Sequence, residues 1–302
     1  MSEIRSLVSI FIPVYNSSKY VDEAIRSAQN QTYKNLEIVI SDDASTDGSE
    51  VKLKELASKD SRIKLFIQEK NLGITKNCNF LLKQCHGEYI CFTAGDDVLA
   101  PECIESGVNE MKLNQNIAIL FNSVKYIDSN SNLIKNNIRV LPKHYGLLKD
   151  FLKKGINIPM NGMIVRGSFM MNCKFNESMP NASDFSLIWC ILDKKDARFL
   201  YLNKVLSYYR IHEKSITSLK RIECTKEAML ENHKLGIIYP KYIYYSMKRT
   251  RKQALDLIRF RGLYLKQIQV LLLFSLPVHL IEYIFDKKNL IWKYKNKFLM
   301  KL

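Results

Sequence analysis

The stretch LEIVISDDASTDGS (residues 36–49) combines two patterns that decide the fold. Its first five residues form a short, β-rich apolar run, which predicts a buried strand. Asp42 and Asp43 follow after Ser41, and Asp47 lies a few residues further on among small turn residues. Adjacent carboxylates repel each other and a strand end needs only a turn, so fold stability alone does not account for this pair. The stretch therefore predicts a buried strand that ends at a site with a use for negative charge.

The same alternation of strand and helix extends over the first hundred residues. Apolar runs predict strands at 7–16, 36–40, 63–68 and 88–94, and helical spacing predicts helices at 17–31, 47–58 and 75–85. Such alternation is typical of an α/β fold with a mainly parallel, doubly wound, Rossmann-like sheet. Ligands of these sheets bind outside the carboxyl ends of the strands. Two aspartate pairs, Asp42–Asp43 and Asp96–Asp97, are expected at that edge.

The pattern is looser after residue 100. Strands are expected at 117–128, 162–169 and 197–212, and helices at 183–195 and over 221–262. We therefore expect a first domain over residues 1–218 and a basic helical extension over residues 219–302.

The net charge of +16 is concentrated at the C-terminal end of the 302-residue chain. From residue 216 onward there are 18 Lys and Arg against 6 Asp and Glu, and the residues before it carry 28 against 24. The apolar stretch 268–285 is short and interrupted for a membrane-spanning helix, which needs about 20 apolar residues. Beside basic helices it suggests a helix in the interface of an anionic membrane. The alternative is a soluble helix that closes the domain's own core.

Seven cysteines are scattered through apolar runs without a CxxC pair or a zinc-ligand spacing. This pattern predicts reduced thiols buried in the core. The N-terminal residues enter a strand-like run and show no signal-peptide pattern. We therefore expect a cytoplasmic protein.

Two carboxylate pairs at neighbouring strand ends suit a hard divalent cation together with a ligand that offers hydroxyl and N–H groups. Oxygen ligands favour Mg²⁺ or Mn²⁺, which commonly bridge a protein to phosphates. A nucleotide diphosphate donor would use such a site, because the cation neutralises charge on the departing diphosphate. A purely structural role is the main expectation for Asp47, in a turn. A purely structural role explains Asp96 and Asp97 less well, because capping a helix uses one aspartate and not two.

Five separated motifs resemble those of a known family. They are VSIFIPVYNSSKYVDEAIRSAQNQTYKNLEIVISDDASTDGS (8–49), NLGITKN (71–77), GEYICFTAGDDVLAP (87–101), FNESMPNASDFSLIW (175–189) and YYRIHEKSIT (208–217). In this order they resemble the family 2 glycosyltransferases of GT-A fold, of the type that builds bacterial surface polysaccharides. The resemblance covers roughly residues 7–218.

The resemblance implies a nucleotide-sugar donor and residues that hold it. Pro13 and Tyr15 would lie beside the nucleotide base, with Tyr15 stacked on it. Asp43 would accept the base N–H, which favours uracil and hence UDP. Asp96 would bind the ribose, and Lys76 would reach the nucleotide.

The resemblance also implies a metal site and a catalytic base. Asp97 would bind Mn²⁺ or Mg²⁺, and His212 would face the diphosphate or the metal, although a structural role for this histidine is equally compatible with the sequence. Ala94 replaces the first carboxylate of the commoner Asp-x-Asp-Asp pattern, which would weaken metal binding. Asp184 would be the catalytic base, although Ser183 stands where a Glu often precedes it. A helix-start role is the alternative for Asp184.

Taken with the charge pattern, the resemblance implies an inverting enzyme of the hexosyl- or N-acetylhexosaminyltransferase class. It would move a sugar to a hydroxyl of a glycan or a lipid-linked acceptor, at the inner face of the cytoplasmic membrane. Two other functions remain open. A catalytically inactive GT-A scaffold would share the fold, and a nucleic-acid-binding protein would explain the basic tail. Because no nucleic-acid-binding motif is present, we do not expect a nucleic-acid partner.

Overall fold

The computed structural model describes residues 5–139, 143–154, 159–181, 184–220, 223–225 and 227–229. The chain divides into two compact units, Met1–Glu227 and Ala228–Leu302. The described residues fall almost wholly in the first unit, so the boundary expected after residue 218 stays a prediction. The apolar stretch 268–285 and most of the helical region expected over 221–262 lie outside the described residues.

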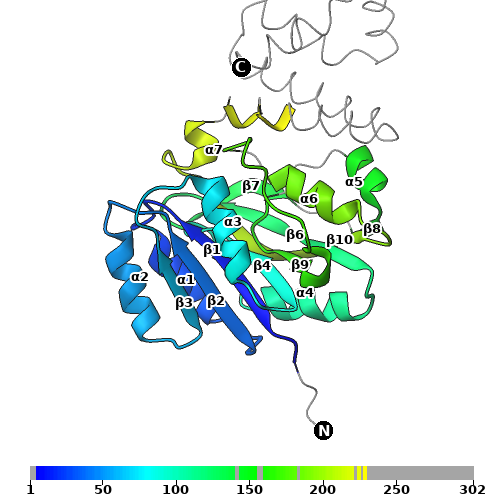
Figure 1. The fold of residues 1–302 in the computed structure, drawn as a ribbon, viewed down its shortest axis with the longest axis horizontal. Coiled ribbons are helices and arrows are strands. Elements are labelled where there is room, and N and C mark those ends of the chain that lie inside the picture. The colour runs from blue at the N-terminus through cyan, green and yellow to red at the C-terminus, as the bar shows by residue number, and fades with distance from the viewer. Residues whose placement is uncertain are drawn as a thin grey trace, which may run out of the picture. The chain divides into compact units, whose positions relative to one another are not determined.

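The first half of the sheet follows the predicted alternation of strand and helix (Figure 1). Its elements are β1 (Val8–Val14), α1 (Val21–Gln29), β2 (Leu36–Asp42), α2 (Ser49–Ser58), β3 (Ile63–Ile67), α3 (Ile74–Gln84) and β4 (Tyr89–Phe92). Strand β1 pairs in parallel with β2 and β4, and β2 pairs in parallel with β3. Helices cover both faces of this sheet, which is why β1, β2 and β4 are continuous buried runs.

The second half of the sheet is mixed. Its elements are β5 (Val98–Leu99), α4 (Cys103–Lys112), β6 (Ile117–Ile127), β7 (Leu133–Arg139), β8 (His144–Gly146), α5 (Leu148–Lys154), β9 (Met163–Arg166), the 3₁₀ helix η1 (Gly167–Phe169), α6 (Asp184–Leu192), β10 (Arg198–Arg210) and α7 (Ile216–Leu219). The strand order is β3-β2-β1-β4-β9-β6-β10-β5, with β7 beside β6 and β8 beside β10. Strand β9 runs antiparallel to β4 and β6, whereas β10 runs parallel to β6. The α/β fold is confirmed, and the parallel arrangement expected for the sheet holds from β1 to β4.

Alternate residues of β1 belong to the cores on opposite faces of the sheet. Ile10 and Ile12 pack in an aliphatic cluster with residues of α1, α2 and α4. Phe11 points to the other face, where its ring centroid lies 4.8 Å from that of Phe92 and 6.3 Å from that of Phe175. Because β1 is packed on both sides, the loop that follows it has a fixed base.

Gly87 lets the turn before β4 pass close to β1. A Cβ atom added there would lie 2.5 Å from the backbone N of Ser9 and 2.6 Å from the backbone O of Tyr89. Backbone atoms cannot give way without disturbing the strand pairing. We expect Gly87→Ala to lower the free energy of unfolding by about 3 kcal/mol, the upper part of the range for overpacking, as measured by urea denaturation.

Gly48→Ala is the matched control for this prediction. Gly48 has a φ of 90°, which strains an alanine, but no atom lies within 4 Å of the added Cβ. The expected loss is therefore only the backbone strain, about 1 kcal/mol. Equal losses in the two variants would show that the close approach at Gly87 is unimportant.

Candidate functional site

Three loops meet at the carboxyl edge of the central parallel strands. The N–H of Asp43, after β2, donates to the carbonyl of Val14 at 2.9 Å, and the N–H of Gly95, after β4, donates to that of Pro13 at 3.2 Å. Both loops are therefore tied to the end of β1, where the half-exposed Tyr15 follows. The structure thus brings the aspartates predicted after β2 and β4 to the two sides of one strand end.

Asp43 is buried and binds the backbone of the loop before α3. Its Oδ1 accepts the N–H of Leu72 at 2.7 Å, and its Oδ2 accepts that of Gly73 at 3.0 Å. Burial raises the pKa of Asp43 and the nearby charge of Asp42 adds to the rise, whereas the two N–H bonds oppose it. Each carboxylate oxygen has a second lone pair, so Asp43 can still accept a hydrogen bond from a ligand.

The other two aspartates of the opening stretch hold the loop together. Asp42 accepts the N–H of Ser45 at 2.9 Å. Asp47 accepts the N–H of Ser18 at 2.8 Å and that of Ser49 at 3.1 Å. Burial would raise the pKa of Asp47, but hydrogen bonds from Ser49 and Ser18 outweigh it and lower that pKa. The turn role expected for Asp47 is confirmed, and Asp43 is the member of the three with a surrounding suited to a ligand.

Asp96 and Asp97 have different partners, which are the last residue of β10 and a residue just after that strand. The carboxylate of Asp97 is buried, and its Oδ1 accepts the backbone N–H of Arg210 at 2.8 Å. The side chain of Asp96 is 25% exposed, and its Oδ2 lies 2.9 Å from Nε2 of His212. The other ring nitrogen, Nδ1 of His212, is buried and has no hydrogen-bond partner within the described part of the chain.

Arg210 is a site residue that the sequence analysis missed. It is 1% exposed, its Nε donates to the carbonyl of Asp96 at 2.7 Å, and its Nη2 donates to Glu23 of α1 at 2.6 Å. The guanidinium lies 4.8 Å from the ring centroid of Tyr20, and the ring of His212 lies 4.7 Å from the same tyrosine. These contacts fasten the end of β10 beside the aspartate pair. One sequence signal could have indicated this role: Arg210 is a charged residue inside a strand-like stretch, two residues before the candidate His212.

The surroundings of Asp97 fit a divalent cation. Burial raises the pKa of Asp97 well above its usual range, the charge of Asp96 adds to the rise, and Arg210 opposes it. A carboxylate in such surroundings ionises most easily when a cation approaches. Its Oδ2 accepts no hydrogen bond from the described residues, and the unpartnered Nδ1 of His212 is a second atom with binding capacity. This oxygen and nitrogen suit Mn²⁺ or Mg²⁺.

The protein would supply only part of the coordination shell of such a cation. Within the described ranges, no three side chains of His, Cys, Asp or Glu gather in an arrangement that could hold a metal. Ala94, at the position where the family pattern has another carboxylate, contributes only a backbone carbonyl that accepts the N–H of Asp97 at 3.3 Å. The remaining ligands would have to come from phosphate oxygens and water.

Asp184 is the first residue of α6, so the helix-start role describes its position correctly. Its Oδ1 accepts the N–H of Phe185 at 2.9 Å. Burial raises the pKa of Cys224 to about 11, and the charges of Glu227 and then Asp184 add to the rise. The effect of its charge on Cys224 places Asp184 near that cysteine. Neither this effect nor the bond from Phe185 connects it with the aspartates that follow β2 and β4.

The expectation of seven reduced cysteines is wrong for one pair. Cys173 and Cys190 form a disulfide, with their Cα atoms 5.7 Å apart. The other five cysteines are free thiols. The segment after η1 packs against α6 and brings the two residues together across 17 positions of the chain, a long-range contact that no local spacing reveals.

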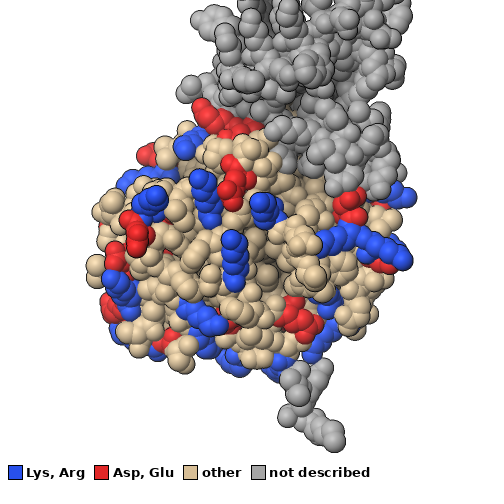
Figure 2. All heavy atoms as spheres, in the orientation of Figure 1, with Lys and Arg blue, Asp and Glu red and all other residues tan. Residues whose placement is uncertain are grey.

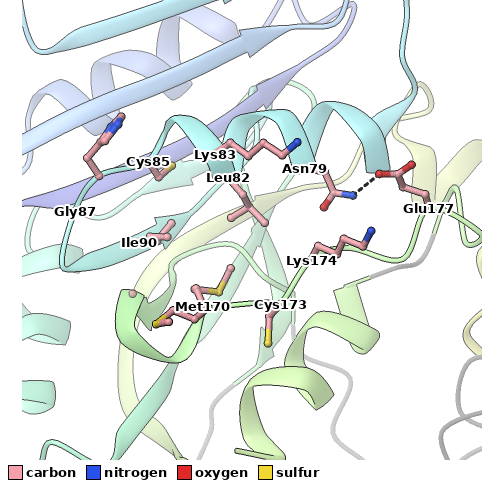
Figure 3. Close-up of a pocket in the computed structure, with 13 residues that line it drawn as sticks. Asn79, Leu82, Lys83, Cys85, Gly87, Ile90, Met170, Cys173, Lys174 and Glu177 are labelled. Carbon is pink, nitrogen blue, oxygen red and sulfur yellow. Dashed lines mark hydrogen bonds between the residues drawn. The ribbon is translucent and has the colours of Figure 1, made fainter.

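A cavity of about 520 Å³ lies beside the C-terminal half of α3, at the amino-terminal end of β4 (Figure 3). Its walls include Lys83 of α3 and the segment after η1, which contributes Met170, Lys174 and Glu177. None of the residues predicted for the site lines it. Lys76, the candidate nearest to it in sequence, is exposed near the other end of α3.

The α/β fold of the chain matches solved structures of GT-A fold. S. aureus TarS 1-349 in complex with UDP aligns with a TM-score of 0.55 at 18% identity, over 94% of this chain and 74% of that chain. The mannosyltransferase PcManGT from Pyrobaculum calidifontis, in complex with GDP-Man and Mn²⁺, aligns with a TM-score of 0.59 at 14% identity, over 95% of this chain and 89% of that chain. At these identities the likeness shows the fold alone.

The chain belongs to glycosyltransferase family 2, because the family model described as Glycosyl transferase family 2 matches residues 9–171. Chondroitin synthase of Escherichia coli is 32% identical over 221 residues, which are 73% of this chain and 31% of that protein. An uncharacterized glycosyltransferase of Haemophilus influenzae is 30% identical over 243 residues, which are 79% of this chain and 93% of that protein. The protein is therefore an enzyme that transfers a sugar from a nucleotide-sugar. In the part of the chain that the structure describes, no helix is long and apolar enough to cross a membrane.

Proposed function

We propose that the protein is an inverting glycosyltransferase that moves a sugar from a UDP-sugar to a hydroxyl of a glycan or lipid-linked acceptor in bacterial surface-polysaccharide synthesis. The observation that carries the proposal is the placement of Asp43 on one side of the end of β1 and of Asp96 and Asp97 on the other. The UDP bound to TarS supports a uridine donor, and the name of the E. coli relative, chondroitin synthase, supports a polysaccharide product.

The donor would bind across the three loops at this edge. Asp43 would accept the N–H of uracil with the lone pairs that its backbone bonds leave free. Tyr15 is exposed enough to stack on the base, with Pro13 beneath it at the end of β1. Asp96 would bind the ribose hydroxyls, and Lys76 would reach the phosphates from α3.

Asp97 and His212 would hold Mn²⁺ or Mg²⁺, with phosphate oxygens completing the shell. The cation, when bound, neutralises negative charge on the departing diphosphate. Arg210 has a positioning role in this arrangement. It anchors Asp97 through its backbone N–H and Asp96 through its side chain, and its contact with Glu23 fixes that geometry to α1.

Asp184 would take the proton from the acceptor hydroxyl as its oxygen attacks the anomeric carbon. The attack comes from the face opposite the diphosphate, so the bond to the new oxygen forms as the bond to the diphosphate breaks and the anomeric configuration inverts. A single displacement of this kind needs one base and forms no covalent enzyme intermediate.

A thermal-shift panel with UDP, GDP, ADP and CDP, each with and without Mn²⁺, tests the donor assignment. We expect UDP with Mn²⁺ to give the largest shift, because a ligand at 100 times its Kd adds about 2.7 kcal/mol to the stability of the folded state. Equal shifts for the four nucleotides would contradict the uridine assignment. Slow hydrolysis of a UDP-sugar without an acceptor would separate an active enzyme from an inactive scaffold.

A further inference from the structure

One side of α3 forms a row that runs from the donor loop to the cavity. Lys76, Asn79 and Lys83 are spaced by three and four residues, which places them on the same side of the helix. A rise of ~1.5 Å per residue separates the two lysines by about 10 Å along the axis. The row begins next to Gly73, whose N–H binds Asp43, and ends at the cavity wall.

The lysines along this path have no carboxylate partner. Lys76, Lys83 and, on the opposite cavity wall, Lys174 are exposed and form no ion pair with any described residue. Lys54 of α2 and Lys59, the residue after α2, differ, because each forms an ion pair of 2.5 Å with a glutamate four residues earlier. Figure 2 shows Lys and Arg side chains down the middle of the face that carries α3. Unpaired cations on facing walls create a positive potential that attracts an anionic ligand.

The cavity combines these charges with an apolar base. Figure 3 shows Lys83 extending from α3 and Lys174 from the segment after η1, and the apolar Ile90 and Met170 also line the cavity. Glu177 is the acidic residue among the described residues that line the cavity, and its carboxylate accepts a hydrogen bond from Asn79 at 2.9 Å. The volume of about 520 Å³ lies within the usual range for ligand pockets, roughly 300–1,000 Å³.

Hydrogen bonds and a disulfide fix the walls of the cavity, and one wall is formed by a segment that continues toward the proposed base. The side chain of Asn79 binds both the N–H and the carbonyl of Phe175, at 2.9 and 3.0 Å, and the Cys173–Cys190 disulfide fixes the same segment to α6. This segment then continues to Asp184, the first residue of α6. A ligand chain held in the cavity therefore contacts the segment that precedes α6, whose first residue is the proposed acceptor base.

We propose that Lys83 and Lys174 bind the acceptor, and that this acceptor is a glycan with carboxylate groups along its chain. The inference rests on the proposed transfer at Asp184. The cavity presents single ammonium groups, and its lining residues include neither an arginine nor the N-terminus of an α-helix, although Gly167 begins the short 3₁₀ helix η1. That arrangement suits singly charged carboxylates better than phosphates, which commonly use those groups.

Isothermal titration of the full chain with three free oligomers as probes tests this proposal. The probes are hexagalacturonate, its neutral α-1,4-linked counterpart maltohexaose, and hexathymidylate as a nucleic-acid anion. We expect the wild type to bind hexagalacturonate and the K83Q/K174Q variant to bind it about fivefold more weakly. Added salt should weaken binding to the wild type. The double variant K54Q/K59Q removes the same formal charge from α2 and the residue that follows it, and should bind like the wild type. UDP-induced thermal shifts in the same variants should stay unchanged.

Each alternative outcome counts against the proposal. No binding of hexagalacturonate, equal binding of maltohexaose, or an equal loss in K54Q/K59Q would overturn it. Tighter, lysine-dependent binding of hexathymidylate would assign Lys83 and Lys174 to nucleic acid instead. Because the titration uses no donor, a failure here leaves the UDP shifts intact, whereas absent UDP shifts would show that the proposed function itself is wrong.

Discussion

Replacing Asp184 by asparagine is expected to lower the transfer rate about 10²–10⁴-fold, the usual contribution of a general base, while the affinity for UDP stays at the wild-type value. The amide has nearly the shape of the carboxylate, and its oxygen can still accept the N–H of Phe185 at the start of α6. The substitution therefore removes the proton acceptor and keeps the helix. Transfer is measured by release of UDP in the presence of acceptor, and affinity by titration with UDP and Mn²⁺.

Asp193→Asn is the matched control, because Asp193 follows the last residue of the same helix. It should transfer sugar at the wild-type rate. An Asp184→Asn variant with full activity would remove this residue from the mechanism. Glu177 would then be the next carboxylate to replace, and one of its oxygens accepts a hydrogen bond from Asn79.

Asp97→Asn is expected to lower metal-dependent UDP binding and turnover together, with turnover falling about 10²–10³-fold. The loss differs from that of Asp184→Asn because donor affinity falls as well. The same change should leave the folded protein without metal as stable as the wild type or more so, since it removes a buried carboxylate whose charged form is disfavoured. Chemical denaturation in the presence of a chelator measures this stability.

Asp97→Ala separates the metal role of this residue from its structural role. Alanine leaves the buried N–H of Arg210 without its acceptor, which should cost about 1–3 kcal/mol of stability. Asparagine keeps an acceptor for this N–H, so Asp97→Asn should not lose this stability. Undiminished Mn²⁺-dependent binding in Asp97→Asn would show that the cation is held elsewhere.

The wild-type response to Mn²⁺ should also depend on pH. The pKa of Asp97 is raised in the folded protein, so below that pKa a proton competes with the cation for the carboxylate. The apparent affinity for Mn²⁺ should therefore rise as pH increases toward the pKa of Asp97 and level off above it. This dependence should disappear in Asp97→Asn.

The sequence was informative wherever the determining interactions are local. The strand ends before Asp43 and Asp96 follow from apolar runs interrupted by turn residues, and the edge of a parallel sheet then brings the two together. The disulfide and the role of Arg210 could not be predicted in this way. Arg210 contacts Asp97 and Glu23 across 113 and 187 positions of the chain, and such separations leave no local pattern to read. The strand expected at 162–169 is present as β9, but its antiparallel direction could not be predicted, because strand direction depends on its distant partners β4 and β6.

The contacts of Arg210 also determine when the site can form during folding. The loops that carry Asp43 and Asp96 belong to the first hundred residues, but the N–H that binds Asp97 comes from the last residue of β10. Contacts between residues so far apart in sequence carry a large loop-closure cost and tend to form late. A chain emerging from the ribosome can thus complete β1 to β4 while its aspartate pair still lacks Arg210 and His212. Catalytic competence therefore arrives with the final strand of the sheet, after nearly all of the first unit has been synthesised.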